Sequence, residues 1–277
     1  MRFVDIKNDI AFRKIFGNEN RKEVLISFLN AVLLLDHNHK IVNVDILTPY
    51  QMPDLKGGKV TIVDVKAKDQ NNKTYIVEMQ VAELDGFDKR VLYYASRSYS
   101  GQIERGNQYE QLKPTFFIGI LDFEGTPNTS YISRHKITDI ETGNSFIKHI
   151  EFNFIELPKF NKQANELTTI IDQWVYFIKN AENLEVIPEN INDEGLKFAY
   201  HDADKHNWTK EELEAYDYVL MREQDDRGRV TLAVRRALQK EKETFATSLL
   251  KSGFSVDEVV KHSNLTIEQV QELNKGI

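Results

Sequence analysis

The chain has 277 residues, of which 41% are hydrophobic and 29% are charged, and its formal net charge is −7. This length and composition suit one sizeable core and a smaller domain. The absence of cysteine excludes disulfide bonds, cysteine-liganded zinc, iron–sulfur clusters and thiol catalysis. No apolar run approaches the roughly 20 residues of a membrane span, and the first residues lack a signal peptide's apolar stretch. The predicted location is therefore the cytoplasm, with no membrane partner.

The net charge also bears on the class of partner. Proteins that bind nucleic acid usually present a basic surface to the phosphates, so a charge of −7 argues against such a partner. DNA fits this composition only if the basic residues gather on one face of the molecule, beside an acidic remainder.

The chain begins with two predicted helices and a strand. Asp9 is expected to cap a short helix that ends at Gly17. Its apolar face carries Phe12, Ile15 and Phe16. A longer helix follows, because apolar residues recur at three- and four-residue spacing. These residues are Leu25, Phe28, Leu29 and Val32. Alternation of Val and Ile with polar residues over 41–47 then predicts the first strand.

A β-hairpin is predicted next. Two runs rich in Val, Ile and Tyr, Val60–Ala67 and Thr74–Val81, flank a polar stretch over 68–73 that has turn chemistry. The literal Pro53-Asp54 dipeptide precedes the hairpin and is interpreted as part of a loop.

Each strand of this hairpin carries an acid, Asp64 or Glu78, on a face that otherwise carries Ile, since side chains alternate along a strand. If the turn is centred on Asn71, the acids are directly opposite, with Cβ atoms roughly 4.5–5.5 Å apart. Carboxylates this close repel each other unless a proton or a cation lies between them. Hard oxygen ligands favour Mg²⁺, Mn²⁺ or Ca²⁺ over zinc, so the pair predicts a divalent metal site.

Residues 88–105 predict a third helix, which ends at Gly106. One side carries Val91, Ala95, Ser98 and Gln102. Arg90, Tyr94 and Arg97 fall together on another side. A phosphate backbone that passes a metal site needs cationic partners, and the forked guanidinium of Arg suits this role. A solvated helix face with tyrosine cover explains the same residues equally well.

The apolar run Thr115–Leu121 predicts a central strand that is buried on both faces. Further strands are predicted over 130–137 and 146–157. After Pro158 the pattern becomes helical, and helices are predicted over 167–181 and 208–224.

The last segment, from about residue 244, predicts two short helices with capping boxes at Ser255 and Thr266. Together they resemble a helix-turn-helix. The second helix carries Glu268 and Glu272, whose charges would oppose phosphates, so the tail is interpreted as a pairing or partner module.

Asp64 followed, a hairpin later, by Glu78-Met79-Gln80 resembles the signature of the PD-(D/E)xK nucleases, with Gln80 where most relatives have Lys. Within that superfamily, the flanking segments resemble the Rpn family of recombination-promoting nucleases, which are also described as transposases. These segments are Asp9–Gly17, Arg90–Tyr94, Gly106–Pro114 and Ile120–Phe123.

The resemblance implies an α/β fold with a restriction-endonuclease-like core, in which helices flank a mixed sheet, and with an α-helical C-terminal extension. The predicted domains are a nuclease-like domain at 1–158, a helical extension at 159–243 and the helix-turn-helix-like tail at 244–277.

The resemblance also implies a metal-dependent DNA endonuclease, with a link to recombination, mobile elements or defence. Asp64, Glu78 and the main-chain carbonyl of Met79 would bind Mg²⁺, or Mn²⁺ or Ca²⁺, and Asp9 is a further candidate ligand. The sequence holds no glycine-rich phosphate loop, so no nucleotide cofactor is expected. A homodimer is expected if both strands of a duplex are cut, since each chain has one site.

Gln80 is the departure from the family pattern, because Gln forms hydrogen bonds but carries no charge. Lys66, two residues after Asp64, is expected on the same strand face and is the candidate for the missing charge. An ordinary surface lysine is the alternative for Lys66.

A catalytically inactive nuclease fold that serves as a DNA-binding or protein-interaction module is the alternative function. Gln80 and the acidic net charge favour it, whereas an unneeded buried acid pair would cost stability. The metal hypothesis requires the two carboxylates to converge on one ion. Carboxylates that point apart, or that are held by arginine bridges, would count against it.

Overall fold

The protein is represented by a computed structural model, which describes residues 3–35, 38–51, 61–104, 106 and 108–277. The predicted strand start at Val60 and the Pro53-Asp54 dipeptide lie outside the described residues. The described chain forms two compact units, Met1–Tyr216 and Asp217–Ile277. The domain boundaries predicted at residues 158 and 243 stay predictions.

The first unit is built on a six-stranded mixed sheet with the order β1-β4-β5-β6-β8-β7. The strands are β1 (Val44–Leu47), β4 (Val65–Asp69), β5 (Thr74–Gln80), β6 (Thr115–Leu121), β7 (Ile132–Lys136) and β8 (Ile150–Glu156). The central strand β6 is parallel to both β5 and β8, and the other pairs are antiparallel. A separate antiparallel pair joins β2 (Tyr50–Gln51) to β3 (Thr61–Ile62).

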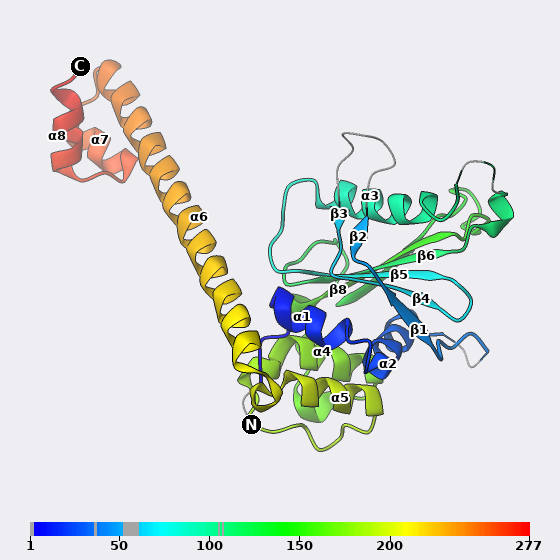
Figure 1. Cartoon of the computed structure of the whole chain (residues 1–277). Coiled ribbons are helices and arrows are strands. Elements are labelled where there is room, and N and C mark those ends of the chain that lie inside the picture. Colours follow the sequence, from blue (N-terminus) through cyan, green and yellow to red (C-terminus); the bar gives the residue numbers. More distant parts are fainter. Residues whose placement is uncertain (1–2, 36–37, 52–60, 105, 107) are drawn as a thin grey trace. The chain divides into compact units, whose positions relative to one another are not determined.

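Helices cover both faces of the sheet (Figure 1). One face is covered by α3 (Phe87–Ser100). The other carries α1 (Asp9–Phe16), α2 (Lys22–Leu33), α4 (Ile170–Asn180) and α5 (Glu194–Ala203). The predicted α/β fold, a mixed sheet with flanking helices and further helices after it, is therefore confirmed. The described part of this unit also contains short 3₁₀ helices at Tyr109–Gln111, Leu157–Lys159, Ala164–Glu166, Ala181–Asn183 and Lys205–Asn207.

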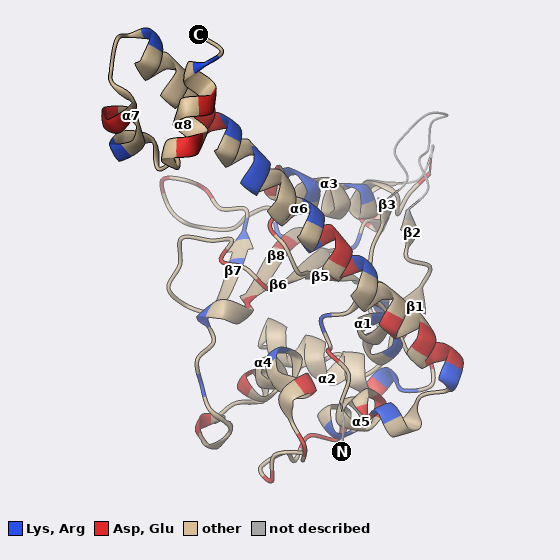
Figure 2. Ribbon diagram, turned by 90° about the vertical axis from the view of Figure 1, so that its left-hand side faces the viewer, with Lys and Arg blue, Asp and Glu red and all other residues tan. Residues whose placement is uncertain are grey.

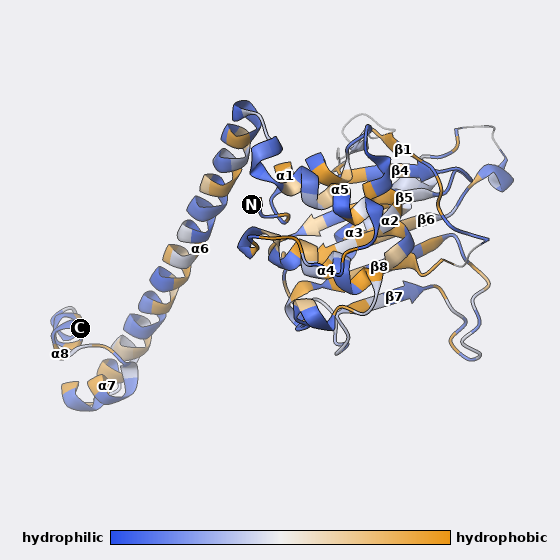
Figure 3. Ribbon diagram, turned by 90° about the horizontal axis from the view of Figure 1, so that it is seen from below, coloured by the Kyte–Doolittle hydropathy of each residue, from blue (hydrophilic) through white to orange (hydrophobic). Residues whose placement is uncertain are grey.

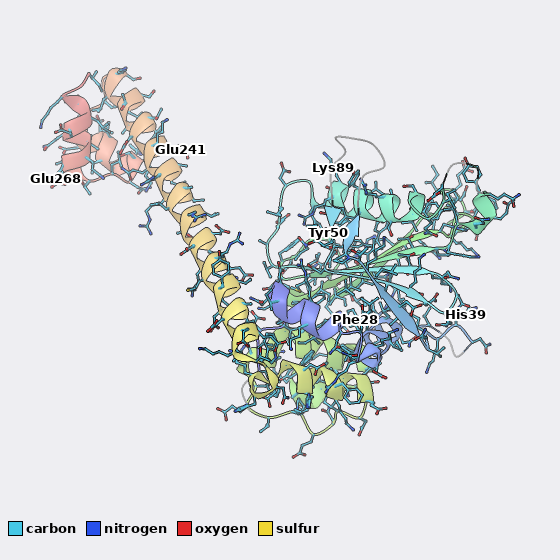
Figure 4. The ribbon with its side chains drawn as sticks, in the orientation of Figure 1. Phe28, His39, Tyr50, Lys89, Glu241 and Glu268 are labelled. Atoms are coloured by element: carbon cyan, nitrogen blue, oxygen red, sulfur yellow. The ribbon has the colours of Figure 1, made fainter. Side chains whose placement is uncertain are left out.

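Aromatic side chains fix α1 within the helical layer. Phe12, Ile15 and Phe16 are buried as predicted. The ring of Phe16 lies 5.1 Å from that of Phe28, which in turn lies 5.6 Å from Trp174 (Phe28 is labelled in Figure 4). Such edge-to-face contacts add to the free energy of area burial, so the backbone of α1 is held firmly against α2 and α4.

Two predicted helix ends were wrong by a few residues. The side chain of Asn8, not Asp9, caps α1 by accepting hydrogen bonds from the amides of Ile10 and Ala11. Asp9 is the first helical residue, and its carboxylate is free of the capping role. The helix α3 ends before Gly101 rather than at Gly106, because the amide of Gly101 closes the last turn on the Arg97 carbonyl.

The helix α5 was not predicted, and it packs most closely against α2. The two backbones approach at Gly195, where a Cβ would lie 2.6 Å from the Cβ of Ser27 and still closer to the Glu23 carbonyl oxygen. Real Cβ atoms do not come this close, so only glycine allows the α2–α5 contact.

Gly195→Ala is expected to lower the free energy of unfolding of the first unit by about 1–3 kcal/mol, the usual cost of overpacking. Chemical denaturation followed by circular dichroism measures this loss. Gly228→Ala, in the helix α6 (Lys210–Lys251), is the matched control, because a Cβ there meets nothing within 4 Å. That change is expected to be neutral or to stabilise the helix by about 0.5–1 kcal/mol. Equal stability of both variants would contradict close packing at Gly195.

The chain continues into α6 (Lys210–Lys251), α7 (Val256–Ser263) and α8 (Ile267–Asn274). The capping boxes predicted at Ser255 and Thr266 are confirmed, and Thr209 forms a further one with Glu212 at the start of α6. The predicted helix end at Gln224 was wrong, since α6 runs without a break to Lys251.

The second unit has a small hydrophobic cluster of its own. Its buried members are Ala246, Val259, Leu265 and Val270, which come from α6, α7 and α8 and the turn between α7 and α8. Much of α6 before this cluster is exposed and hydrophilic (Figure 3). Among the described residues, no helix is both long and apolar enough to cross a membrane.

Candidate metal site

The hairpin of β4 and β5 has the predicted register. Val65 pairs with Val77 and Lys68 with Thr74, which centres the turn on Asn71. The turn is tight because Asn72 adopts a left-handed conformation (φ 61°), which Asn tolerates better than most residues. Asp64 and Glu78 lie one residue past the last pair of this register, and the Asp64 amide hydrogen-bonds to Oε1 of Glu78.

The ladder between the two strands ends just before the acids. Past the Val65–Val77 pair, Val63 would exchange two hydrogen bonds with Met79 if the pairing continued. Instead, the Val63 amide donates to the Pro49 carbonyl over 3.1 Å, and the Met79 amide donates to Oδ2 of Asp64 over 3.0 Å. The Asp64 side chain therefore replaces a main-chain acceptor at the point where the strands separate.

The same separation affects the Met79 carbonyl. Its ladder partner would be the Val63 amide, which is engaged with Pro49. The next carbonyl, that of Gln80, accepts from the Asp122 amide on the β6 side. Successive carbonyls alternate along a strand, so the Met79 oxygen points to the β4 side, beside Asp64. The predicted role of this oxygen as a metal ligand stays a prediction.

Glu78 is 5% exposed on β5. Its pairing partner on the neighbouring strand β6 is Gly119. The ring of Phe154 covers this glycine, and a Cβ added to Gly119 would lie 2.9 Å from the ring. The amide of Asp64 donates to its Oε1 over 3.1 Å. Burial and then the charge of Asp64 raise the pKa of Glu78 to about 8. Below that pH the proton on Glu78 relieves its repulsion with Asp64, and a divalent ion bound to both carboxylates would have to displace this proton.

An arginine that the sequence reading missed contacts this pair. The guanidinium of Arg13, on α1, donates to Oδ1 of Asp64 from Nε at 3.2 Å and from Nη2 at 2.8 Å. Partial burial opposes the Arg13 charge, but the hydrogen bonds to Asp64 and its charge still raise the pKa of Arg13. The structure thus contains an arginine bridge of the kind that counts against the metal hypothesis. Of the four carboxylate oxygens of Asp64 and Glu78, the bridge occupies one, Oδ1 of Asp64.

Asp9 lies one helical turn before Arg13 and near the same acids. Partial desolvation of the carboxylate and then the charge of Asp64 raise the pKa of Asp9, although the residue as a whole is exposed. The structure therefore places Asp9 within electrostatic range of the pair, at its edge rather than in hydrogen-bond contact.

Gln80 connects the acids to α3. Its Nε2 donates to Oε2 of Glu78 over 3.2 Å, and its Oε1 accepts from Nη2 of Arg90. Burial and then the charge of Glu78 raise the pKa of Tyr94, which places this hydroxyl near the site. Arg90 and Tyr94 thus face the acid pair from α3.

Arg97 bonds to another residue of α3, and Lys66 lies within the ladder of β4 and β5. Arg97 donates to the Tyr93 hydroxyl over 3.1 Å on the outer part of α3. Lys66 stands opposite Ile76, and its pKa is lowered by burial and then by Lys68. The described hydrogen bonds and ion pairs include none between Lys66 and either acid, so its catalytic role stays a prediction.

The donor set suits Mg²⁺. Within the described part of the chain, no group of three or more His, Cys, Asp and Glu side chains is placed to hold a metal. Two carboxylates and the Met79 carbonyl nevertheless supply hard oxygen donors, and Mg²⁺ is commonly held by one or two carboxylates, with water and substrate phosphate as its other ligands. The residues present therefore fit such an ion.

A mixed sheet between helical layers, with an acid pair at the end of an antiparallel hairpin, defines a protein of the PD-(D/E)xK nuclease class. The profile of the PD-(D/E)XK nuclease family transposases matches residues 6–233, so the chain belongs to this family. No curated protein and no solved structure matches the chain.

Proposed function

We propose that this protein is a metal-dependent DNA endonuclease in which Asp64, Glu78 and the Met79 carbonyl hold Mg²⁺ or a similar divalent ion. The observation that carries the proposal is the buried like-charge pair: Glu78 has its pKa raised to about 8 beside Asp64. Family membership supports a phosphodiester substrate, and transposases act on DNA.

A bound divalent ion would lower the pKa of a water molecule and stabilise the charge that develops on the scissile phosphate. The side chains have separate parts in this chemistry. Asp64 and Glu78 would hold the ion, while hydrogen bonds from the amides of Met79 and Asp64 keep the two acids in place. Gln80 positions Glu78 and links it to Arg90.

The substrate would bind along α3. Arg90 and Tyr94 face the acid pair, and Arg97 lies further along the same helix. Lys and Arg residues mark α3 in Figure 2, and Lys89 is labelled on this helix in Figure 4. A basic helix beside the site would reconcile DNA binding with an acidic net charge, since a local cationic strip is enough to position a phosphate backbone. A homodimer and a cytoplasmic location stay predictions.

A catalytically inactive DNA-binding or protein-interaction module is the second candidate. Two observations favour it: Arg13 already occupies Oδ1 of Asp64, and Gln80 carries no charge. Against it, Glu78 is a buried acid, which lowers the stability of the fold, and an inactive module would have no need of it.

Metal binding separates the two candidates. The wild-type protein is expected to bind Mg²⁺ at one site in calorimetric titration, and to cut supercoiled plasmid with Mg²⁺ or Mn²⁺ but not with EDTA. A protein that binds no Mg²⁺ and leaves plasmid intact in every metal would refute the endonuclease and favour the inactive module.

A further inference from the structure

Arg13 combines a fixed backbone with an accessible side chain. The helix α1 is anchored through Phe12, Ile15 and Phe16, which are buried. The Arg13 side chain itself is 43% exposed, whereas the Asp64 side chain that it contacts is 8% exposed. The guanidinium thus reaches the acid from the solvent side, and it can leave Asp64 without any movement of α1.

The cationic side chains around the acid pair differ in their bonding partners. Arg90 is bonded to Gln80, and the described contacts join Lys66 to neither acid. Lys14, the residue after Arg13, is paired with Glu212 and lies over the ring of Trp208. Arg13 is the cation with a direct bond to Asp64 among the described ion pairs.

The contact also has the right chemistry for exchange. A guanidinium offers a planar fork of donors that matches carboxylate and phosphate oxygens alike. Nε and Nη2 of Arg13 both donate to Oδ1 of Asp64, whereas Oδ2 accepts from the Met79 amide, so Oδ1 is the oxygen that is bonded to an exchangeable side chain. A divalent ion at that oxygen would repel the guanidinium, while an incoming phosphate would attract it.

We propose that Arg13 supplies the positive charge that Gln80 does not. In the metal-free protein Arg13 neutralises Asp64. When a divalent ion binds the Asp64 carboxylate, the Arg13 guanidinium moves to a phosphate of the bound DNA beside the cleavage position. This inference rests on the proposed function, and it makes the arginine bridge an exchangeable contact rather than a permanent block.

The test compares Arg13→Gln, Arg13→Lys and the matched control Lys22→Gln. Lys22 carries the same kind of exposed bridge, 3.2 Å from Asp45, away from the acid pair. Three quantities are measured for each protein: Mg²⁺ affinity by calorimetry, affinity for a DNA duplex in Ca²⁺ over a range of salt concentrations, and single-turnover cleavage in saturating Mg²⁺.

Arg13→Gln is expected to bind Mg²⁺ about two- to fivefold more tightly, because a competing ion pair is gone. It is expected to bind DNA more weakly, with a salt slope smaller by about one, since one phosphate contact is lost. Its cleavage rate is expected to fall about 10²-fold, as for the loss of one charge-stabilising donor. Arg13→Lys keeps the charge and should recover part of the rate, while Lys22→Gln should match wild type.

An Arg13→Gln protein that binds DNA in Ca²⁺ with wild-type affinity and salt slope and cuts at the wild-type rate would overturn the inference, leaving Arg13 a structural ion pair. Weaker Mg²⁺ binding by this variant would also overturn it, because it would show that Arg13 supports the metal site. Failure of the proposed function looks different: the wild-type protein would then neither bind Mg²⁺ nor cut. Thermal unfolding of each variant checks that the fold is intact, and Arg13→Lys keeps the test open if Arg13→Gln misfolds.

Discussion

Asp64→Asn and Glu78→Gln are each expected to lower the rate of metal-dependent DNA cleavage by about 10²–10³-fold, the usual loss when a preorganised charge at a reacting phosphate is removed. Each substitution keeps the shape of the side chain and an oxygen that accepts hydrogen bonds. That oxygen would still accept from the main-chain amide of Met79 in the first variant and of Asp64 in the second, so the local backbone should be preserved. DNA binding in Ca²⁺ is expected to change far less than cleavage.

Single-turnover cleavage of supercoiled plasmid in Mg²⁺ and in Mn²⁺ measures this effect. Asp45→Asn is the matched control, because Asp45 is a carboxylate on the neighbouring strand β1 that pairs only with a surface lysine in the described contacts. If either acid variant cut plasmid at the wild-type rate, its carboxylate would not hold the ion.

The free energy of unfolding of the metal-free protein is expected to fall as the pH rises from about 4.5 to about 8. Glu78 has a pKa of about 8 in the folded protein, against 4.5 for an unperturbed glutamate. Between these values the folded state holds a proton that the unfolded state has lost, so raising the pH favours unfolding. Each unit of difference is worth about 1.4 kcal/mol.

Denaturant unfolding in EDTA at several pH values measures this trend, and the difference between wild type and Glu78→Gln isolates the contribution of Glu78. The wild-type curve should fall relative to that of the variant across this window. Mg²⁺ should reverse the loss and bind more tightly as the pH rises, because binding must displace the Glu78 proton. Parallel curves for the two proteins would show that Glu78 titrates normally.

The parts of the site that lie close in sequence were predictable. The register of the hairpin follows from alternation and from a polar turn that tolerates a left-handed residue, so the closeness of Asp64 and Glu78 at the end of the hairpin could be predicted from the sequence. The apolar faces of α1, α2 and α4 were predictable for a similar reason, because a helical period over two or three turns is a strong local signal.

The Arg13–Asp64 contact joins residues 51 positions apart, and no local pattern indicates it. Its one trace in the sequence is that Arg13 lies four residues after Asp9, a spacing that puts both on one side of a helix. Asn8 and Asp9 are both good capping residues, and only the backbone geometry decides between them. The helix α5 was missed because Gly195 lowers its helical propensity, although the same glycine permits its close packing on α2.

The continuity of α6 has a consequence for cooperativity. One end of this helix carries Tyr216, which is buried in the first unit, and the other carries Ala246, which is buried in the second. The residues between them are largely exposed and are supported by local pairs such as Asp226–Arg229. Local unfolding of an exposed helix costs less free energy than unfolding of the packed core in either unit. Loss of α6 in its middle would thus leave the acid pair intact, and the chain should unfold in more than one transition.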